Sequence, residues 1–187
     1  MKKISILPLI ILTISTVGMT LATKAQTQEA QLPENSTSFT GGVPTLVSAD
    51  APGVYSETNY LSPQYFFTLD LPADANQSLG QAKIQQQESP QPIEFDLDKT
   101  KGFEGTMNKK GQALKLKEVT EDTQTQTINV SFEPPVPPGT TFTISLQAQQ
   151  NPSEGGIYQF TVNAFPAGDN PMGLDLGVGR LQFEQPF

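Results

Sequence analysis

Short runs in which apolar and polar residues alternate recur along most of this chain. The clearest run lies between Tyr65 and Leu71, and Pro72 ends it. Alternation with a period of two predicts a β-strand that buries one face and exposes the other. Similar runs are centred on these residues: Ile84, Phe95, Leu114 with Leu116, Val130, Ile144, Phe160, and Leu181 with Phe183. A less regular edge strand is expected near residues 45–48.

Seven or eight such strands, separated by turns rich in proline and glycine, predict an all-β fold. Strands of a parallel sheet would be apolar on both faces, so the one-sided alternation favours an antiparallel, immunoglobulin-like β-sandwich with little helix. Single helical turns are expected only near residues 74–79 and 103–107. Four prolines are expected to stiffen the entry to the strand after Gly139: Pro134, Pro135, Pro137 and Pro138.

The first 25 residues have the three-part pattern of a signal peptide. Lys2 and Lys3 precede an apolar run from Ile4 to Val17, and small residues precede a cleavage site near Ala25. The apolar run is too short for a convincing membrane span. The pattern predicts three segments: a signal peptide over 1–25, a flexible N-terminal lead-in over 26–41, and one β-sandwich domain over 42–187. The mature protein is then expected to be secreted or periplasmic.

The acidic composition argues against nucleic acid as a partner. The formal charge is −8, and removal of the three lysines of the predicted signal peptide changes it to −11. A surface of this charge repels nucleic acid and anionic lipid headgroups. Arg180 is the only arginine, so paired guanidinium forks for phosphate or carboxylate ligands cannot form. We expect Arg180 to bond a carboxylate or loop carbonyls within the fold.

Histidine, cysteine and tryptophan are absent from the sequence. Without the first two there is no imidazole base, no thiolate nucleophile and no histidine- or cysteine-bound metal. We therefore expect a protein that is not an enzyme, with no catalytic residue, no cofactor and no metal site. A lipid anchor carried by cysteine is not expected, nor is a membrane span in the mature form.

Carboxylate pairs are the one class of acid–base chemistry that the composition leaves open. The candidates are Glu104, Glu118, Glu121, Asp122 and Glu154. No feature of the sequence selects two of them, so a carboxylate-based glycan hydrolase stays an alternative. Tyr55, Tyr60 and Tyr65 are able to stack on a sugar, but packing in the core or at an edge is the expected role.

Two groups of side chains with oxygen atoms are candidate cation sites. They are Glu94, Asp96 and Asp98 on one predicted strand, and Asp169, Asn170 and Asp175 in a glycine-rich loop. The structural interpretation of the first group is a solvated strand face, and that of the second is a series of turns closed by Asp and Asn. We expect the structural role for both groups, and calcium binding stays an alternative.

Several segments resemble a known protein family. They are Phe132 to Thr141 (FEPPVPPGTT), Ala164 to Pro171 (AFPAGDNP), Phe95-Asp-Leu, Gly156-Ile-Tyr and Gly177-Val-Gly-Arg-Leu181. From roughly Gly42 to Phe183 they resemble a family of secreted cyanobacterial proteins that is classed as a domain of unknown function. The resemblance implies export and a small β-rich domain, and it supplies no enzymatic residues.

Together these observations predict a non-catalytic binding or structural module of the cell envelope. Its partner would be an unidentified envelope or extracellular protein or glycan, and not nucleic acid. One alternative is a calcium- or carbohydrate-binding adhesion module, and the other is the carboxylate-based glycan hydrolase.

Overall fold

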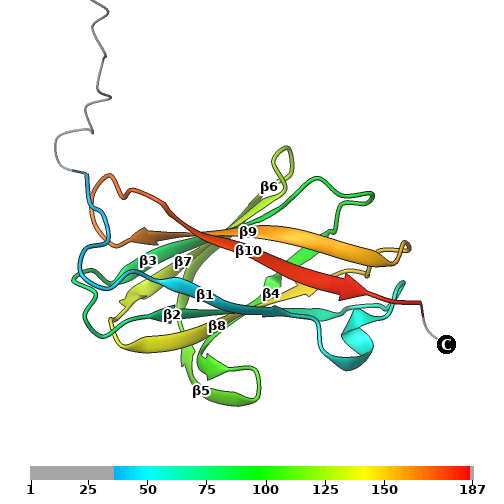
Figure 1. The fold of residues 1–187 in the computed structure, drawn as a ribbon, viewed down its shortest axis with the longest axis horizontal. Coiled ribbons are helices and arrows are strands. Elements are labelled where there is room, and N and C mark those ends of the chain that lie inside the picture. Colours follow the sequence, from blue (N-terminus) through cyan, green and yellow to red (C-terminus); the bar gives the residue numbers. More distant parts are fainter. Residues whose placement is uncertain (1–35, 186–187) are drawn as a thin grey trace, which may run out of the picture. The chain divides into compact units, whose positions relative to one another are not determined.

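Two five-stranded antiparallel sheets pack face to face in the computed structural model, which describes residues 36–185 (Figure 1). The first sheet has the order β1 (Thr45–Asp50), β2 (Gln64–Leu71), β8 (Thr140–Ala148), β4 (Phe95–Thr106) and β5 (Lys109–Leu114). The second has the order β10 (Leu174–Phe183), β9 (Gly156–Pro166), β3 (Leu79–Gln86), β7 (Thr127–Val136) and β6 (Leu116–Asp122). The predicted immunoglobulin-like antiparallel sandwich is confirmed.

Helix is minor, as expected. In the described part of the chain the helical content is a single 3₁₀ turn, η1 (Gly53–Ser56). No helix among residues 36–185 has the length and apolar character needed to cross a membrane. The predicted signal peptide, and residues 26–35 of the predicted lead-in, lie outside the described residues.

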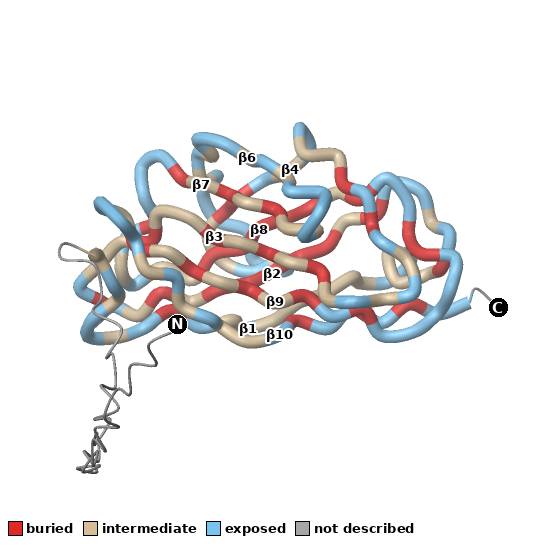
Figure 2. The backbone as a smooth tube through the Cα atoms, turned by 90° about the horizontal axis from the view of Figure 1, so that it is seen from above, coloured by how far each residue is buried: buried red, intermediate tan, exposed pale blue. Residues whose placement is uncertain are grey.

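The core lies between the two sheets, where Figure 2 shows buried stretches on the strands of both layers. On β2 the residues Tyr65, Phe67, Leu69 and Leu71 are fully buried, as their alternation predicted. Aromatic rings meet across the interface, and Phe67 lies edge-on to Phe160 of β9 with ring centroids 5.5 Å apart. Each large apolar side chain removed from water contributes about 1.5–3 kcal/mol.

Strand β4 continues through a segment for which the sequence predicted a helical turn. The prediction for residues 103–107 is wrong, because β4 runs to Thr106 and then turns back into β5. Phe103 pairs with Thr143 of β8, so a cross-strand partner stabilises the extended backbone here. The helical prediction near residues 74–79 is also wrong, because the chain forms only a short turn there before β3 begins.

The predicted strand around Leu114 and Leu116 is in fact two strands in different sheets. Leu114 pairs with Gly102 of β4, whereas Leu116 pairs with Phe132 of β7. The chain therefore passes from one sheet to the other at Lys115. This passage is one reason why the structure has ten strands rather than seven or eight.

The proline-rich segment is also divided differently from the prediction. Pro134 and Pro135 lie inside the last part of β7 rather than in the entry to β8. Gly139 forms the turn before β8 with a positive φ of 79°, and its amide donates a 2.8 Å hydrogen bond to the carbonyl of Leu71. The glycine permits a turn that most L-residues would strain.

The edge strands β1 and β10 of the two sheets run side by side (Figures 1 and 2). At this seam Gly179 of β10 faces Ala49 of β1. A Cβ atom placed on Gly179 would lie 2.5 Å from the Cβ of Ala49. The missing side chain at Gly179 therefore permits the close approach of the two edges.

Candidate functional site

The outer face of the first sheet is unusually well buried near its centre. In a sandwich the outward residues of a central strand are normally polar and solvated. Here Phe66 and Thr68 of β2, and Thr143 and Ser145 of β8, point outward from the core yet are at most 5% exposed. Phe103 of β4 also points outward, because it pairs with Thr143 in the same cross-strand row. Another part of the chain must therefore cover this face.

The cover is the hairpin that β4 and β5 form. The register of β4 shifts between Phe103 and Gly105, and Gly105 has a positive φ of 80°. The hydroxyl of Thr143 donates a 2.7 Å hydrogen bond to the carbonyl of Gly105, so this backbone lies over the outer face. Because that bond uses the one hydroxyl proton of Thr143, Thr68 is the donor in the 2.9 Å bond between the two threonine hydroxyls.

Lys110 of β5 extends from the hairpin across the covered face. Its ammonium nitrogen lies 5.1 Å from the ring centroid of Phe103 and 5.6 Å from that of Phe66. Both distances are within the range of cation–π attraction. Since Phe66 belongs to β2, the Lys110 side chain spans the strand β8 that separates β2 from β4.

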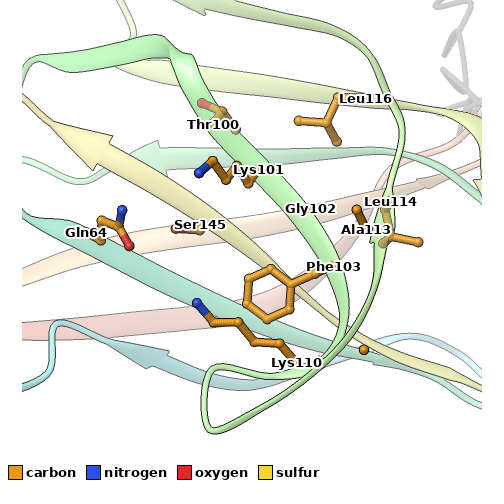
Figure 3. A pocket seen from close by; sticks show the side chains of 11 residues that line it. Gln64, Thr100, Lys101, Gly102, Phe103, Lys110, Ala113, Leu114, Leu116 and Ser145 are labelled. Carbon is orange, nitrogen blue, oxygen red and sulfur yellow. The ribbon is translucent and has the colours of Figure 1, made fainter.

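A cleft of about 550 Å³ opens beside this lysine (Figure 3). We call it the hairpin cleft, and its lining residues are Gln64, Thr100, Lys101, Gly102, Phe103, Lys110, Gly111, Ala113, Leu114, Leu116 and Ser145. Lys101 lies in the same cross-strand row as Ser145 and Phe66. The cleft thus combines two ammonium groups with apolar side chains and with neutral polar groups, and no carboxylate lines it. Its volume is in the range of small-molecule sites.

A second hollow, of about 700 Å³, lies at the turn end of the same hairpin. We call it the turn hollow, and its lining residues are Glu104, Gly105, Thr106, Lys109, Lys110, Gly111, Gly139, Thr140 and Thr141. Lys110 and Gly111 line both hollows. The hydroxyl of Thr141 already donates a 2.5 Å hydrogen bond to Asp70, whereas Glu104 supplies a carboxylate to this hollow.

Both hollows belong to a basic region that the net charge conceals. Six of the seven lysines among residues 36–185 fall between Lys99 and Lys117, and Glu104 is the only acid in that stretch. The region was not predicted, because the net charge averages over the whole chain and hides a local cluster of lysines. A count of charges by segment would have located it, but not the residues of other strands, such as Gln64 and Ser145, that complete the cleft.

The first candidate cation group lies at the start of β4. Glu94 precedes the strand, Asp96 pairs with Gln147 of β8, and Asp98 is exposed. Burial raises the pKa of Glu121 on β6, and the charge of Glu94 raises it further. Nowhere among residues 36–185 are three Asp or Glu side chains placed to hold one metal ion.

The second candidate, the loop with Asp169, Asn170 and Asp175, is held by Thr37 and by its own turns. The Thr37 hydroxyl donates a 2.9 Å hydrogen bond to the Asp169 carbonyl, and the Thr37 amide donates one of 3.3 Å to the Asn170 carbonyl. The carboxylate of Asp175 accepts a 2.8 Å bond from the amide of Gly177. Asn170 has a positive φ of 46°, which is typical of Asn in turns.

The candidate carboxylates for hydrolysis occupy different parts of the fold. Glu104 lines the turn hollow, Glu118, Glu121 and Asp122 lie on β6, and Glu154 precedes β9. Asp122 closes a turn, because its carboxylate accepts hydrogen bonds from the amides of Gln124 and Thr125. The Thr125 side chain is the largest cause of a lowered pKa of Asp122, and the two amide bonds lower that pKa further. In neither of the two hollows does the structure place a pair of acids.

The tyrosines and Arg180 do not form a site. Tyr65 is fully buried, and Tyr55 and Tyr60 pack edge-to-face with centroids 5.8 Å apart. Arg180 is exposed on β10 opposite Gln159. No hydrogen bond found among the described residues comes from its guanidinium, so the expected bond to a carboxylate or a loop carbonyl is not made there.

Comparison with known proteins decides the family. A family model described as "Protein of unknown function (DUF2808)" matches residues 36–183. The chain belongs to the DUF2808 family. The resemblance to a family of unknown function is therefore confirmed, whereas the cyanobacterial origin and the export of its members stay predictions. No curated protein matches the sequence.

Solved structures of other proteins are similar to this chain at low sequence identity. The bacterial hydrophobin BslA is 16% identical with a TM-score of 0.48, over 79% of this chain and 98% of that one. The collagen adhesin CNA of S. aureus is 11% identical with a TM-score of 0.42, over 78% of this chain and 49% of that one. The N-terminal domain of the Streptococcus gordonii adhesin Sgo0707 is 16% identical with a TM-score of 0.47, over 75% of this chain and 32% of that one.

Proposed function

We propose that this DUF2808 protein is an exported, non-catalytic binding module of the cell envelope that holds an acidic sugar in the hairpin cleft. The observation that carries the proposal is the pair Lys101 and Lys110, which line one cleft without a carboxylate in a chain of net charge −8. The pattern of the first 25 residues supports export.

The chemistry of the cleft favours a sugar that carries a carboxylate. Leu114 and Leu116 provide an apolar wall for the C–H face of a sugar ring, and Gln64 and Ser145 provide partners for its hydroxyls. The two ammonium groups match a carboxylate, which accepts charge-assisted hydrogen bonds from both of them. A neutral sugar would leave both charges without a counter-charge.

Isothermal titration with α-1,4-linked digalacturonate tests the proposal. The matched probe is the methyl ester of the same disaccharide, which differs only by the loss of its charges. We expect digalacturonate to bind at least about tenfold more tightly than the ester, because each charge-assisted hydrogen bond contributes about 1.5–3 kcal/mol.

Variants locate the binding to the cleft. Lys101→Ala and Lys110→Ala should each weaken digalacturonate binding by about tenfold. Lys83→Ala is the matched control, because Lys83 lies on β3 in the other sheet, with its ammonium 4.6 Å from the Phe165 ring centroid. No measurable binding of digalacturonate, or equal binding of the ester, overturns the proposal.

A further inference from the structure

We propose that the natural ligand is a polymer, an acidic polysaccharide that crosses the β4–β5 hairpin and occupies the hairpin cleft and the turn hollow together. This inference rests on the proposed function of the hairpin cleft and adds a second subsite to it. The turn hollow is that subsite.

The two hollows are adjacent because they share a piece of β5. Lys110 and Gly111 line both of them. Gly111 packs against β4, since a Cβ there would lie 3.1 Å from the Cβ of Glu104. Opposite Lys110 stands Gly105, which also lacks a side chain. Neither glycine puts a side chain between the two hollows, and this leaves room for a bound chain to continue from one hollow to the other.

Lysines are distributed along the whole path. Lys101 lines only the hairpin cleft, Lys110 lines both hollows, and Lys109 lines only the turn hollow. A ligand that extends over both hollows thus meets three ammonium groups in succession. A single small anion would use one or two of them and leave the turn hollow empty.

The remaining groups favour a polyuronate over a more densely charged polymer. The carboxylate of Glu104 in the turn hollow is able to accept hydrogen bonds from sugar hydroxyls, and it repels a densely charged polymer more strongly than one with a single carboxylate per sugar. Outside the stretch 99–117 the sequence holds 18 of its 19 acids. Duplex DNA carries about one charge per 1.7 Å, so this acidic surround opposes it strongly. A polysaccharide with one carboxylate per sugar matches three spaced lysines far better.

The test compares α-1,4-linked oligogalacturonates of two, four and six units by isothermal titration with the purified protein. We expect the hexamer to bind at least about tenfold more tightly than the dimer, because filling a second linked subsite adds affinity without a second association step. The hexamer should also lose more affinity than the dimer when salt is raised, since it engages more lysines.

Lys109→Ala separates the two subsites. We expect it to weaken hexamer binding by about five- to tenfold and to leave dimer binding within twofold of the wild type. Lys101→Ala should weaken both ligands. Lys117→Ala, an exposed lysine on β6 that lines neither hollow, is the charge-matched control and should change neither. Equal melting temperatures of the variants show that the hairpin is intact.

The outcomes distinguish the two proposals. Equal affinity for dimer and hexamer, or a Lys109→Ala variant that binds both as the wild type does, overturns the polymer inference and leaves the single-cleft function standing. Absence of binding for every length overturns the proposed function itself. Length-dependent binding that Lys109→Ala abolishes supports both.

Discussion

The hydroxyl of Thr143 donates a 2.7 Å hydrogen bond to the carbonyl of Gly105, and this contact fixes the β4–β5 hairpin over the outer face of the first sheet. Thr143 is fully buried, and its hydroxyl also accepts the 2.9 Å bond from Thr68. One side chain thus connects β2, β8 and the hairpin. The shape of the hairpin cleft depends on this connection, because the hairpin forms one of its walls.

Thr143→Val should destabilise the protein by about 1–3 kcal/mol. Valine keeps the shape of threonine but leaves the Gly105 carbonyl and the buried Thr68 hydroxyl without a partner, and such groups cost their desolvation energy. Urea unfolding measures the loss. Thr45→Val, an exposed position on β1, is the control and should change stability by less than about 0.5 kcal/mol. Indistinguishable midpoints for the two variants would contradict the role of Thr143.

Asn151 has a comparable role at the other end of the first sheet. Its side-chain oxygen accepts a 2.6 Å bond from the Tyr65 hydroxyl, and its amide donates bonds of 2.8 and 2.6 Å to the carbonyls of Tyr55 and Glu57. Burial raises the pKa of Tyr65, and Tyr158 adds to the rise, so the hydroxyl stays protonated and keeps donating in alkaline solution.

Asn151→Ala should therefore cost more than Tyr65→Phe. The first leaves three groups without a partner and is expected to destabilise by about 2–5 kcal/mol, whereas the second leaves one acceptor and costs about 1–2 kcal/mol. Urea unfolding compares the stability of the two variants. Tyr60 is only partly buried, so Tyr60→Phe is the control for the loss of a hydroxyl. A larger effect of Tyr65→Phe than of Asn151→Ala would refute this assignment.

The alternation of apolar residues predicted the sandwich because it is a local property. On β2 every second residue from Tyr65 to Leu71 faces the core, and no knowledge of the partner strand is needed to see it. Alternation cannot name that partner. Leu114 and Leu116 keep the same period across Lys115, although the chain changes sheets there.

The candidate site was not predictable from the same signal. Phe103 was predicted to lie in a helical turn, whereas it lies on β4 and faces the outer side of the sheet, where the hairpin buries it. Gln64 and Lys110 come from distant parts of the chain and meet only through the order of strands β2, β8, β4 and β5. Charge averaged over the chain also concealed the lysines of the hairpin.

Glu121 should make stability depend on pH in the mildly acidic range. Burial and the charge of Glu94 raise its pKa in the folded protein, so folding favours the protonated form. Stability is then highest below the ordinary glutamate pKa, about 4.3, and falls as the pH rises through the raised value. At pH 7 the ionised Glu121 costs stability.

Glu121→Gln should consequently raise the melting temperature at pH 7 and leave it nearly unchanged at pH 3.5, which calorimetry across this range measures. Glu94→Gln should give a smaller rise at pH 7, because it removes only the secondary cause and leaves the burial of Glu121. A lower melting temperature of Glu121→Gln at pH 7 would show that the carboxylate makes a favourable contact instead.

The close contact between β1 and β10 can be tested by exchanging the glycine and the alanine that face each other there. Gly179→Ala places a Cβ 2.5 Å from that of Ala49, and the strain of such overpacking is about 1–3 kcal/mol. Ala49→Gly alone should cost about 0.5–1 kcal/mol, because glycine weakens a strand. In the double variant the clash is gone, and the other neighbours of the new Cβ lie at 3.5 and 3.7 Å, which is ordinary contact.

The two substitutions should therefore be strongly non-additive. Urea unfolding of the four proteins gives the coupling energy, and we expect the double variant to be more stable than the sum of the single effects by about 1–2 kcal/mol. Distant sites that do not touch add within about 0.5 kcal/mol. Additive behaviour here would mean that β1 and β10 separate in solution, and that Gly179 is not required for their contact.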